Sequence, residues 1–545
     1  MIAPDRSVFL IGCPDGAGPS LAEATPQALG FKAYNLWRMA GLGLRVPPAF
    51  VLGTAWCTDA ESRRAACEPQ AWQAGLQALE QACGLRLGDV RRPLLVSVRS
   101  GAPVSMPGMM ETLLNIGLCE ATVPGLLRQT GRPRLVWDAY RRLIATYGEV
   151  VAGLEAAVFE EDRARLGADR DERDLDFAEL RSLCRSHLRR FAEEAGRPFP
   201  QDPVSQLGEA IAAVLASWQS DRAVEYRRLH ALPDSLGTAV TVQRMVFGNA
   251  GARSGSGVGF TRDPVSGEPR PWVDFLFNAQ GEDVVSGRRS AHGHDELAAR
   301  LPDCWNELET ATRSLEHALG DMQDFEFTVE EGRLYLLQTR SGKRSAQAAA
   351  RIALDLHDEG LIDTATARQR TADLDEQALG QRRVCADDGQ TLQPLAHAAS
   401  AGPGVACGLI ALDEAAALAL RSRGEPVVLV RSDAETSDLA ALEQAEGLLT
   451  CHGARTSHAA VIARQLGKVC LVGCAGLEID LAARCLRLGG QLMREGEAIS
   501  LDGNEGDIYA GLVRTRIEQP RELWARLQRL RGEPPGSALP SGPCP

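Results

Sequence analysis

Segments of different pattern follow one another along the 545 residues, and this succession constrains the fold more than any single motif. Residues 1–110 mix short strand and helix patterns, and residues 237–340 return to strand patterns. Between them, over about 120–235, Gly and Pro are few and apolar residues recur at helical spacing, which predicts a helical insertion. Because so long a chain exceeds the size of a single hydrophobic core, we predict several domains of α/β and α+β type.

The second half of the chain changes pattern again. Residues 341–384 are rich in strong helix formers with apolar residues at helical spacing, so they predict a helical linker. A Gly- and Pro-containing break near residue 401 marks a further domain, over residues 385–515, in which strands alternate with helices. Residues 516–545 predict a short helix, over 521–530, followed by a Pro/Gly-rich disordered tail.

Composition excludes several classes of function. The net charge of -13 argues against a nucleic-acid binder held by a basic face, whereas phosphate binding needs only local cations and Mg²⁺. No apolar run approaches the roughly 20 residues that span a bilayer, and the first residues lack the pattern of a signal peptide. Fourteen scattered cysteines indicate reduced thiols. We therefore expect a cytoplasmic protein without membrane or nucleic-acid partners.

The sequence TCHGARTSHAAVIARQLGK, residues 450–468, places a histidine at the start of a predicted helix. Thr456 and Ser457 are good N-cap residues, and Gly467 is a natural helix terminator. His458 then lies in the first turn, where free backbone N–H groups and the helix dipole favour a neutral, nucleophilic imidazole. The same groups favour an attached phosphoryl group, so His458 is a candidate phosphoryl carrier.

Two alternatives for this segment stay open at the level of the residues alone. A histidine at a helix start can simply pack or cap the helix. A metal site is the second alternative, although its spacing matches no usual zinc pattern. Its candidate ligands are Cys451, His452, His458, Cys470 and Cys474.

A pair of strand patterns, QDFEFT and LYLLQTR, predicts a hairpin with its turn at residues 330–332. Residues two apart in a strand share a face, so Asp324 and Glu326 project together, as do Gln338 and Arg340 on the return strand. Two carboxylates facing an amide and a guanidinium are suited to Mg²⁺ and nucleotide phosphates. A solvated hairpin face with a surface ion pair is the alternative.

Two more segments are candidates for phosphate contact. The Gly-rich sequence FGNAGARSGSGVGFTRDP, residues 247–264, leaves backbone N–H groups uncovered, and strand patterns on both sides predict a β-hairpin lid. We take Gly255 and Gly257 as its phosphate-binding positions, with a flexible structural turn as the alternative. Lys32 and Arg99 are cations that matter only if the fold brings them to the phosphates.

Together these segments resemble the pyruvate phosphate dikinase family. The sequences VRSGAPVSMPGMMETLLNIGL, VFGNAGARSGSGVGFTRDPVSGE, FNAQGEDVVSG, DMQDFEFTVEEGRLYLLQTRSGKR and TSHAAVIAR occur in that family's order and spacing, and the resemblance covers nearly all of residues 25–513. It implies an ATP-grasp-type nucleotide-binding domain over residues 1–340 and a swivelling β/α phosphohistidine domain, the PEP-utilising mobile domain, over residues 385–515. Since that domain must travel between sites, we expect a mobile linker around residues 341–400.

The resemblance also implies a reaction. His458 would attack the β-phosphorus of ATP, AMP would leave, and inorganic phosphate would take the terminal phosphoryl group as diphosphate. It implies phosphate binding by Lys32, Arg99 and Arg340, Mg²⁺ binding by Asp324 and Glu326, and assistance by Gln338.

The final acceptor is not evident from the residues. The family's usual third domain is a C-terminal barrel that binds pyruvate or phosphoenolpyruvate, and we expect none in residues 514–545. Our first hypothesis is a phosphotransferase that passes its phosphoryl group to pyruvate on a separate barrel protein. A kinase for another small-molecule acceptor and a non-catalytic nucleotide-binding regulatory remnant are the alternatives. The resemblance allows a homodimer, and it leaves open whether phosphate or water takes the second phosphoryl group.

Some residues depart from the family's pattern. His452-Gly453-Ala454 stands in place of the usual Arg-Gly-Gly, a change that would slow phosphoryl transfer or suit a different acceptor. Ala252 and Arg253 replace residues that are commonly acidic or polar, which would alter nucleotide handling. Thr456 matches a threonine that is phosphorylated in regulated relatives. A phosphate dianion at Thr456 would repel ATP.

Overall fold

The structure is a computed structural model that describes residues 7–13, 24–104, 106, 110–166, 174–285, 294–385, 392–433, 438–453, 455 and 458–532. Contacts divide the chain into two compact units. The first comprises Met1–Ala250 with Tyr335–Thr339, and the second comprises Gly251–Leu334 with Arg340–Pro545. This division differs from the predicted boundaries at residues 340 and 385, which stay a proposal. Across the described ranges, none of the helices combines the length and apolar character that crossing a membrane requires.

A five-stranded antiparallel sheet organises the first unit, in the order β1-β2-β7-β5-β6. Its strands are β1 (Val8–Ile11), β2 (Ala49–Leu52), β5 (Val96–Gly101), β6 (Thr112–Ile116) and β7 (Ala239–Arg244). Phe50, Val242 and Val98 lie opposite one another and therefore share a face, which is buried in the main hydrophobic core. Thr241 and Arg99 are opposed on the other face, so one side of the sheet is apolar and the other carries polar groups.

Helices surround this sheet and form a large part of the first unit. The helices and short strands are α1 (Pro26–Gly41), η1 (Thr54–Cys57), α2 (Ala60–Ala66), α3 (Pro69–Cys83), β3 (Arg86–Leu87), β4 (Pro93–Leu94), α4 (Val123–Thr130), α5 (Pro133–Val150), α6 (Ala157–Ala164), α7 (Phe177–Ala195), α8 (Pro203–Ser217), α9 (Asp221–Leu229) and η3 (Asp234–Leu236). The start of α7 shows why such segments are helical. Asp176 caps the backbone N–H of Glu179, while the Glu179 side chain accepts from the Asp176 N–H, a complete capping box.

A four-stranded sheet in the order β11-β10-β8-β9 belongs to the second unit, except for Tyr335–Thr339 of β11, which are counted with the first. Its strands are β8 (Gly255–Phe260), β9 (Trp272–Phe277), β10 (Gln323–Glu330) and β11 (Arg333–Ser341), and its helices are α10 (Gly281–Val285), α11 (Asp295–Arg300) and α12 (Pro302–Leu319). The predicted hairpin is confirmed, and its turn lies at Glu331-Gly332. Both residues have positive φ, 50° and 78°, as the twist of a two-residue hairpin turn requires.

The prediction that the strands flanking the Gly-rich segment pair with each other as a β-hairpin lid is wrong. β7 belongs to the five-stranded sheet, between β2 and β5, whereas β8 belongs to the four-stranded sheet, between β10 and β9. The alternating patterns that flank the glycines are therefore two strands of separate sheets. Alternation identifies a strand but carries no information on its partner.

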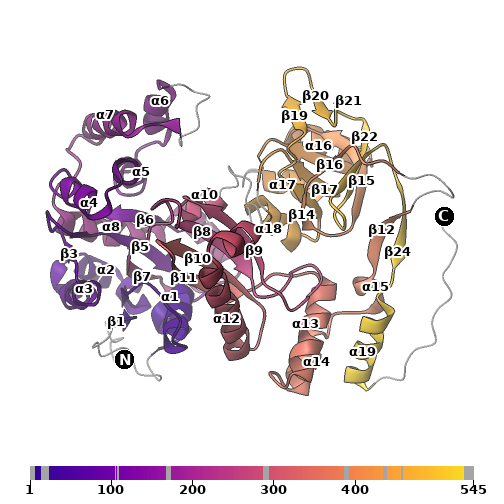
Figure 1. The fold of residues 1–545 in the computed structure, drawn as a ribbon, viewed down its shortest axis with the longest axis horizontal. Coiled ribbons are helices and arrows are strands. Elements are labelled where there is room, and N and C mark those ends of the chain that lie inside the picture. The colour runs from indigo at the N-terminus through magenta and orange to yellow at the C-terminus, as the bar shows by residue number, and fades with distance from the viewer. Residues whose placement is uncertain are drawn as a thin grey trace. The chain divides into compact units, whose positions relative to one another are not determined.

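Helices α13 (Ala346–Asp358), α14 (Thr364–Arg370) and α15 (Glu376–Leu379) occupy the predicted linker, and α19 (Arg521–Arg531) packs against them (Figure 1). Leu354, Ala367 and Leu527 are buried together in their common core. Strands β12 (Gln381–Cys385) and β24 (Arg514–Glu518) pair antiparallel and connect this helical cluster with the domain that follows.

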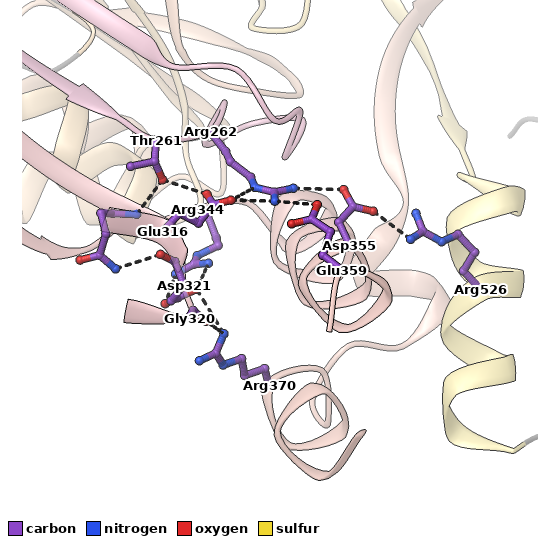
Figure 2. A network of polar contacts seen from close by, with 11 residues as sticks. Thr261, Arg262, Glu316, Gly320, Asp321, Arg344, Asp355, Glu359, Arg370 and Arg526 are labelled. Carbon is purple, nitrogen blue, oxygen red and sulfur yellow. Dashed lines mark hydrogen bonds and ion pairs between the residues drawn. The ribbon is translucent and has the colours of Figure 1, made fainter. Parts of the chain in front are cut away.

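A network of charged side chains around the buried Arg262 ties the helical cluster to the four-stranded sheet (Figure 2). Arg262, just after β8, contacts Glu316 of α12 and also Asp355 and Glu359 of α13. Arg526 of α19 contacts Asp355 from the other side, at 2.8 Å. The linker helices are thus held by charged side chains as well as by apolar packing.

An eight-stranded sheet forms the last domain, in the order β13-β23-β22-β15-β16-β17-β18-β14. Its elements are β13 (Ala396–His397), β14 (Ala399–Gly402), β15 (Val405–Ala411), α16 (Glu414–Arg421), β16 (Val427–Arg431), α17 (Leu439–Gln444), β17 (Gly447–Thr450), α18 (His458–Gln465), β18 (Val469–Val472), β22 (Ala498–Asp502) and β23 (Asp507–Ala510). Strands β15 to β18 are parallel, as expected for strands joined by helices. A small sheet of β19 (Leu477–Asp480), β20 (Cys485–Leu488) and β21 (Gln491–Arg494) completes the domain.

The two faces of this sheet are covered differently. One core joins alternate strand residues with alanines of α16, α17 and α18, including Ala417, Ala441 and Ala460. The other core joins the remaining strand residues with Leu486 and Met493 of the small sheet. Strands buried on both faces explain the continuous apolar runs of β16 and β18.

Candidate functional site

Strand β10 carries the two candidate metal ligands, and β11 places a guanidinium beside one of them. Phe325 and Phe327 are buried, while Asp324 and Glu326 are half-buried on the opposite face, as the strand alternation predicts. Arg340 Nε donates to Asp324 Oδ2 at 2.8 Å. Burial raises the pKa of Asp324, the charge and hydrogen bond of Arg340 oppose that shift, and the charge of Glu326 adds to it.

The donor set of this strand fits Mg²⁺ only in combination with a phosphate ligand. Asp324 and Glu326 supply two carboxylates on one face, and the hydrogen bond from Arg340 engages one Asp324 oxygen. Within the part of the chain that the structure describes, no three His, Cys, Asp or Glu side chains gather as a metal site. Mg²⁺ commonly takes one or two carboxylates and completes its shell with phosphate oxygens and water, so two are sufficient.

The first unit positions Lys32 through a close backbone contact. Gly30 has φ of 71°, and a Cβ added there would lie 1.8 Å from the carbonyl oxygen of Gly101, so only glycine fits. Phe31 N–H donates to Ala102 O at 2.8 Å, which joins the first turns of α1 to the end of β5. Lys32 is exposed at this junction. The close contact at Gly30 thus places Lys32 near the end of β5.

Arg99 lies on the polar face of the five-stranded sheet. It is opposed to Thr241, and Ser97 is opposed to Gln243 on the same face. Arg99 Nε and Thr241 Oγ1 are both buried without a hydrogen-bond partner among the described residues. Buried polar atoms are usually paired, so these two atoms on one face are candidates for contact with a polar ligand.

The predicted site residues are divided between the two units. Gln338, in the middle of β11, is half-buried, and its neighbour Thr339 accepts a hydrogen bond from Asn35 Nδ2 of α1 at 2.7 Å. The first unit holds Lys32, Arg99 and Gln338, and the second holds Asp324, Glu326, Arg340 and His458. Among the described side chains of the second unit, Asp324 and Arg340 form an ion pair, and Glu326 lies on the same face as Asp324.

Gly255 and Gly257 do not occupy the phosphate loop that we expected. Both lie in β8, which is buried and pairs with β9 on one side and β10 on the other. Their backbone groups belong to these ladders and are not available to a phosphate. A Cβ at Gly255 would lie 2.2 Å from the ring of Phe275, and one at Gly257 would lie 2.4 Å from the ring of Phe327. The glycines make room for aromatic side chains.

His458 is the first residue of α18, which follows directly from the small-residue loop after β17. The prediction that it lies in the first turn of a helix is confirmed, and Gly467 ends the helix with φ of 65°. The structure describes the backbone of His458 but not its side chain, and the predicted caps Thr456 and Ser457 lie outside the described residues. Its position gives it the free N–H groups of a helix start.

The surroundings of His458 do not favour the zinc alternative. Burial raises the pKa of Cys470, to about 12, and that of Cys474. Cys470 and Cys474 belong to the two different cores on the opposite faces of the eight-stranded sheet, so they do not face one common site. His452 is exposed and pairs with Asp433, Nδ1 to Oδ2, at 3.4 Å.

The two departures in the Gly-rich segment lie at the hairpin turn. The carbonyl oxygen of Arg253 accepts from Gly332 N–H at 2.8 Å, and that of Ala252 accepts from Arg300 Nη2 at 3.0 Å. A Cβ at Gly332 would lie 2.7 Å from Arg253 Nη2, so the Arg253 side chain lies against this turn.

Two arginines near His458 were missed by the sequence predictions. Arg455 precedes His458 by three residues, and Arg464 is buried on α18. The available signal was an arginine among the small and apolar residues of HAAVIARQL, where a charge must find a partner. Asp274, the partner of Arg455, and Ala401, a partner of Arg464, are distant in sequence and have no local signature.

Comparison with known proteins identifies the family. The sequence model described as "Pyruvate phosphate dikinase, AMP/ATP-binding domain" matches residues 65–298 and 294–360. The one described as "PEP-utilising enzyme, mobile domain" matches residues 423–506. The chain belongs to the pyruvate phosphate dikinase family, since the first match covers more than half of its length.

Curated relatives from bacteria and plants match most of the chain. The pyruvate, phosphate dikinase of Clostridium symbiosum is 41% identical over 499 residues, which are 90% of this chain and 57% of the relative. Pyruvate, phosphate dikinase 2 of Zea mays is 40% identical, with 89% of this chain and 56% of the relative covered. The Rhizobium meliloti protein is 41% identical, with 91% and 57% covered. The chain spans little more than half the length of these relatives.

Proposed function

We propose that this chain catalyses ATP-dependent phosphorylation of His458, the donor half of a pyruvate phosphate dikinase reaction. The observation that carries the proposal is the face of β10 and β11, where Asp324 and Glu326 project beside the Arg340 guanidinium. With Mg²⁺ held by its two carboxylates, such a face would bind a nucleotide polyphosphate, and the family membership supports ATP as its ligand.

The proposed reaction balances as two substitutions at phosphorus. A ring nitrogen of His458 forms a bond to the β-phosphorus of ATP, and the bond between the β-phosphorus and the bridging oxygen to the α-phosphate breaks, releasing AMP. Inorganic phosphate then takes the terminal phosphoryl group and leaves as diphosphate, while His458 keeps one phosphoryl group. The charge that develops requires fixed cations.

The chain's own residues supply those cations and hold the metal in this proposal. Arg340, Lys32 and Arg99 neutralise phosphate oxygens, and Gln338 assists by hydrogen bonding. Asp324 and Glu326 would hold Mg²⁺, which supplies charge neutralisation when bound. The free N–H groups in the first turn of α18 would favour the phosphoryl group that His458 carries after the reaction.

We further propose the domain roles and the final acceptor. Residues 1–340 act as an ATP-grasp-type domain, residues 341–384 as a helical linker, and residues 385–515 as a swivelling phosphohistidine domain. The match of residues 423–506 to a mobile-domain family supports the last of these. The names of the relatives support pyruvate as the acceptor, which we place on a separate barrel-type protein.

Isotope labelling tests the donor reaction. The chain is incubated with Mg²⁺ and ATP labelled with ³²P at the β-phosphorus, with and without inorganic phosphate, and both protein-bound label and AMP are measured. We expect acid-labile label on wild type, equimolar AMP, and no label on His458→Ala. With label at the γ-phosphorus, inorganic phosphate should remove the label as diphosphate, whereas removal by water alone would indicate a synthase-type reaction. Equal label on wild type and His458→Ala would exclude the proposal.

A further inference from the structure

The loop before His458 contacts the four-stranded sheet of the second unit through an ion pair. Arg455 Nη2 lies 2.9 Å and Nε lies 3.3 Å from Asp274 Oδ1, on β9. The Asp274 side chain is only 1% exposed. A carboxylate removed from water this completely requires compensation by a cation or hydrogen bonds, so the contact with Arg455 matters to both residues.

Strand register shows which face of the sheet Arg455 contacts. Trp272 is opposed to Phe260 on β8, and Phe260 is opposed to Asp324 on β10. In the neighbouring row, Asp274 is opposed to Val258, which is opposed to Glu326. Directly opposed residues share a face. Arg455 therefore docks on the same face that presents the two candidate Mg²⁺ ligands.

Aromatic contacts and a second arginine reinforce this docking. The Arg455 guanidinium carbon lies 4.1 Å from the centroid of the Trp272 ring, within the range of a cation–π contact. Arg464 of α18 lies 5.6 Å from the same centroid and 5.4 Å from that of Phe260. Its Nη2 donates to the carbonyl oxygen of Arg455 at 3.0 Å, and its Nε donates to Ala401 O at 3.1 Å. Arg464 thus holds the backbone that presents Arg455.

We propose that Arg455 is a positioning residue for the donor reaction, which seats the start of α18 on the Trp272–Asp274 face so that His458 meets the nucleotide held at Asp324 and Glu326. This inference rests on the proposed function and adds to it a residue that sets the geometry of transfer. The Arg455 side chain is 25% exposed and that of Asp274 is 1% exposed, so the contact is open to water only from the Arg455 side. A poorly seated nucleophile slows an in-line transfer strongly without weakening substrate binding.

Single-turnover labelling tests this role. The variants are Arg455→Gln, Asp274→Asn and the double variant, and the control is Arg484→Gln, which removes an ion pair with Asp413 and Glu495 elsewhere in the same domain. At saturating β-labelled ATP we expect each single variant to be phosphorylated about ten- to a hundredfold more slowly, with ATP affinity within about twofold of wild type. The double variant should be no slower than the slower single variant, because both changes break one contact. Unchanged rates, or effects that multiply, would overturn the proposal.

A second measurement separates this inference from the proposed function. Hydrogen exchange of residues 272–277 and of α18 is followed in the full chain without nucleotide. Arg455→Gln should increase exchange in both segments, and Arg484→Gln should leave them as in wild type. If wild type incorporates no label, the proposed function fails, and exchange alone decides whether Arg455 docks this loop. Exchange equal to wild type in Arg455→Gln would refute the docking.

Discussion

Replacing Arg262 with methionine should destabilise the second unit more than any surface substitution. Arg262 Nε and Nη2 lie 2.8 and 2.7 Å from Glu316 Oε1, and Thr261 Oγ1 donates to the other carboxylate oxygen at 3.0 Å (Figure 2). The side chains of Arg262 and Glu316 are 2% and 10% exposed. Methionine keeps most of the apolar stem of arginine and removes its charge.

The magnitude follows from which carboxylates lose their partner. Glu316 would stay buried with only Thr261 as its hydrogen-bond donor in Figure 2, and removing one member of a buried ion pair costs about 3–5 kcal/mol. Asp355 keeps Arg526 at 2.8 Å, and Glu359 is 46% exposed, so each adds less than about 1 kcal/mol. We therefore expect a loss of about 4 kcal/mol, nearly all of it from Glu316.

Hydrogen exchange by mass spectrometry is the suitable assay, because a chain of several domains does not unfold in a single two-state transition. The free energy of opening is measured for peptides of α12 and α13, which carry the carboxylates of this network. Peptides of the first unit serve as an internal reference.

Two further variants show whether loss of the Arg262 charge causes the destabilisation. Arg262→Met combined with Glu316→Met should recover most of the loss, since replacing a whole buried pair by apolar side chains is often neutral. The control is Arg313→Met. The Arg313 side chain is 74% exposed, and its Nη2 lies 3.9 Å from Glu309 Oε2, so this change should alter the free energy of opening by less than about 0.5 kcal/mol. A loss below about 1 kcal/mol for Arg262→Met, or no recovery in the double variant, would refute the reasoning.

Two other predictions concern the first unit. Burial, followed by the charge of Arg141, lowers the pKa of His187 from 6.5 to about 4, so the unfolded chain binds the proton more readily. The free energy of opening of α7 should therefore fall by about 2 kcal/mol between pH 7 and pH 5, and in His187→Phe this free energy, measured by hydrogen exchange, should depend less on pH than in wild type. Gly30→Ala should destabilise α1 and weaken ATP binding measured by calorimetry, because its Cβ has no space. A Cβ at Gly41 would have open space around it, so Gly41→Ala should leave the stability of α1 and ATP binding unchanged.

Local patterns predicted the parts of the site that depend on a single element. The period of two placed Asp324 and Glu326 on one face of a strand and Phe325 on the other, because a strand imposes that alternation wherever it lies. The N-cap residues and a terminal glycine predicted a helix with His458 in its first turn, because both ends of a helix have their own chemistry. These features need no knowledge of distant contacts.

The Gly-rich segment shows where local patterns were insufficient. Glycine fits an open phosphate loop and an aromatic-packed strand equally well, and the sequence around Gly255 and Gly257 does not distinguish them. The rings of Phe275 and Phe327 decided the outcome, and they reach these glycines only because β9 and β10 pair with β8. Strand pairing is a tertiary property that no alternation encodes.

The sequence by itself determined the family, the order of the elements and the candidate nucleophile, because these depend on neighbouring residues and on motifs of fixed length. Tertiary structure alone decided that Arg455 meets Asp274, 181 residues away, on the face that carries Asp324. The physical reason is burial: a carboxylate at position 274 is ordinary in an extended chain. Once the strands pair and exclude water from this carboxylate, leaving it without a cation or hydrogen bonds would cost free energy.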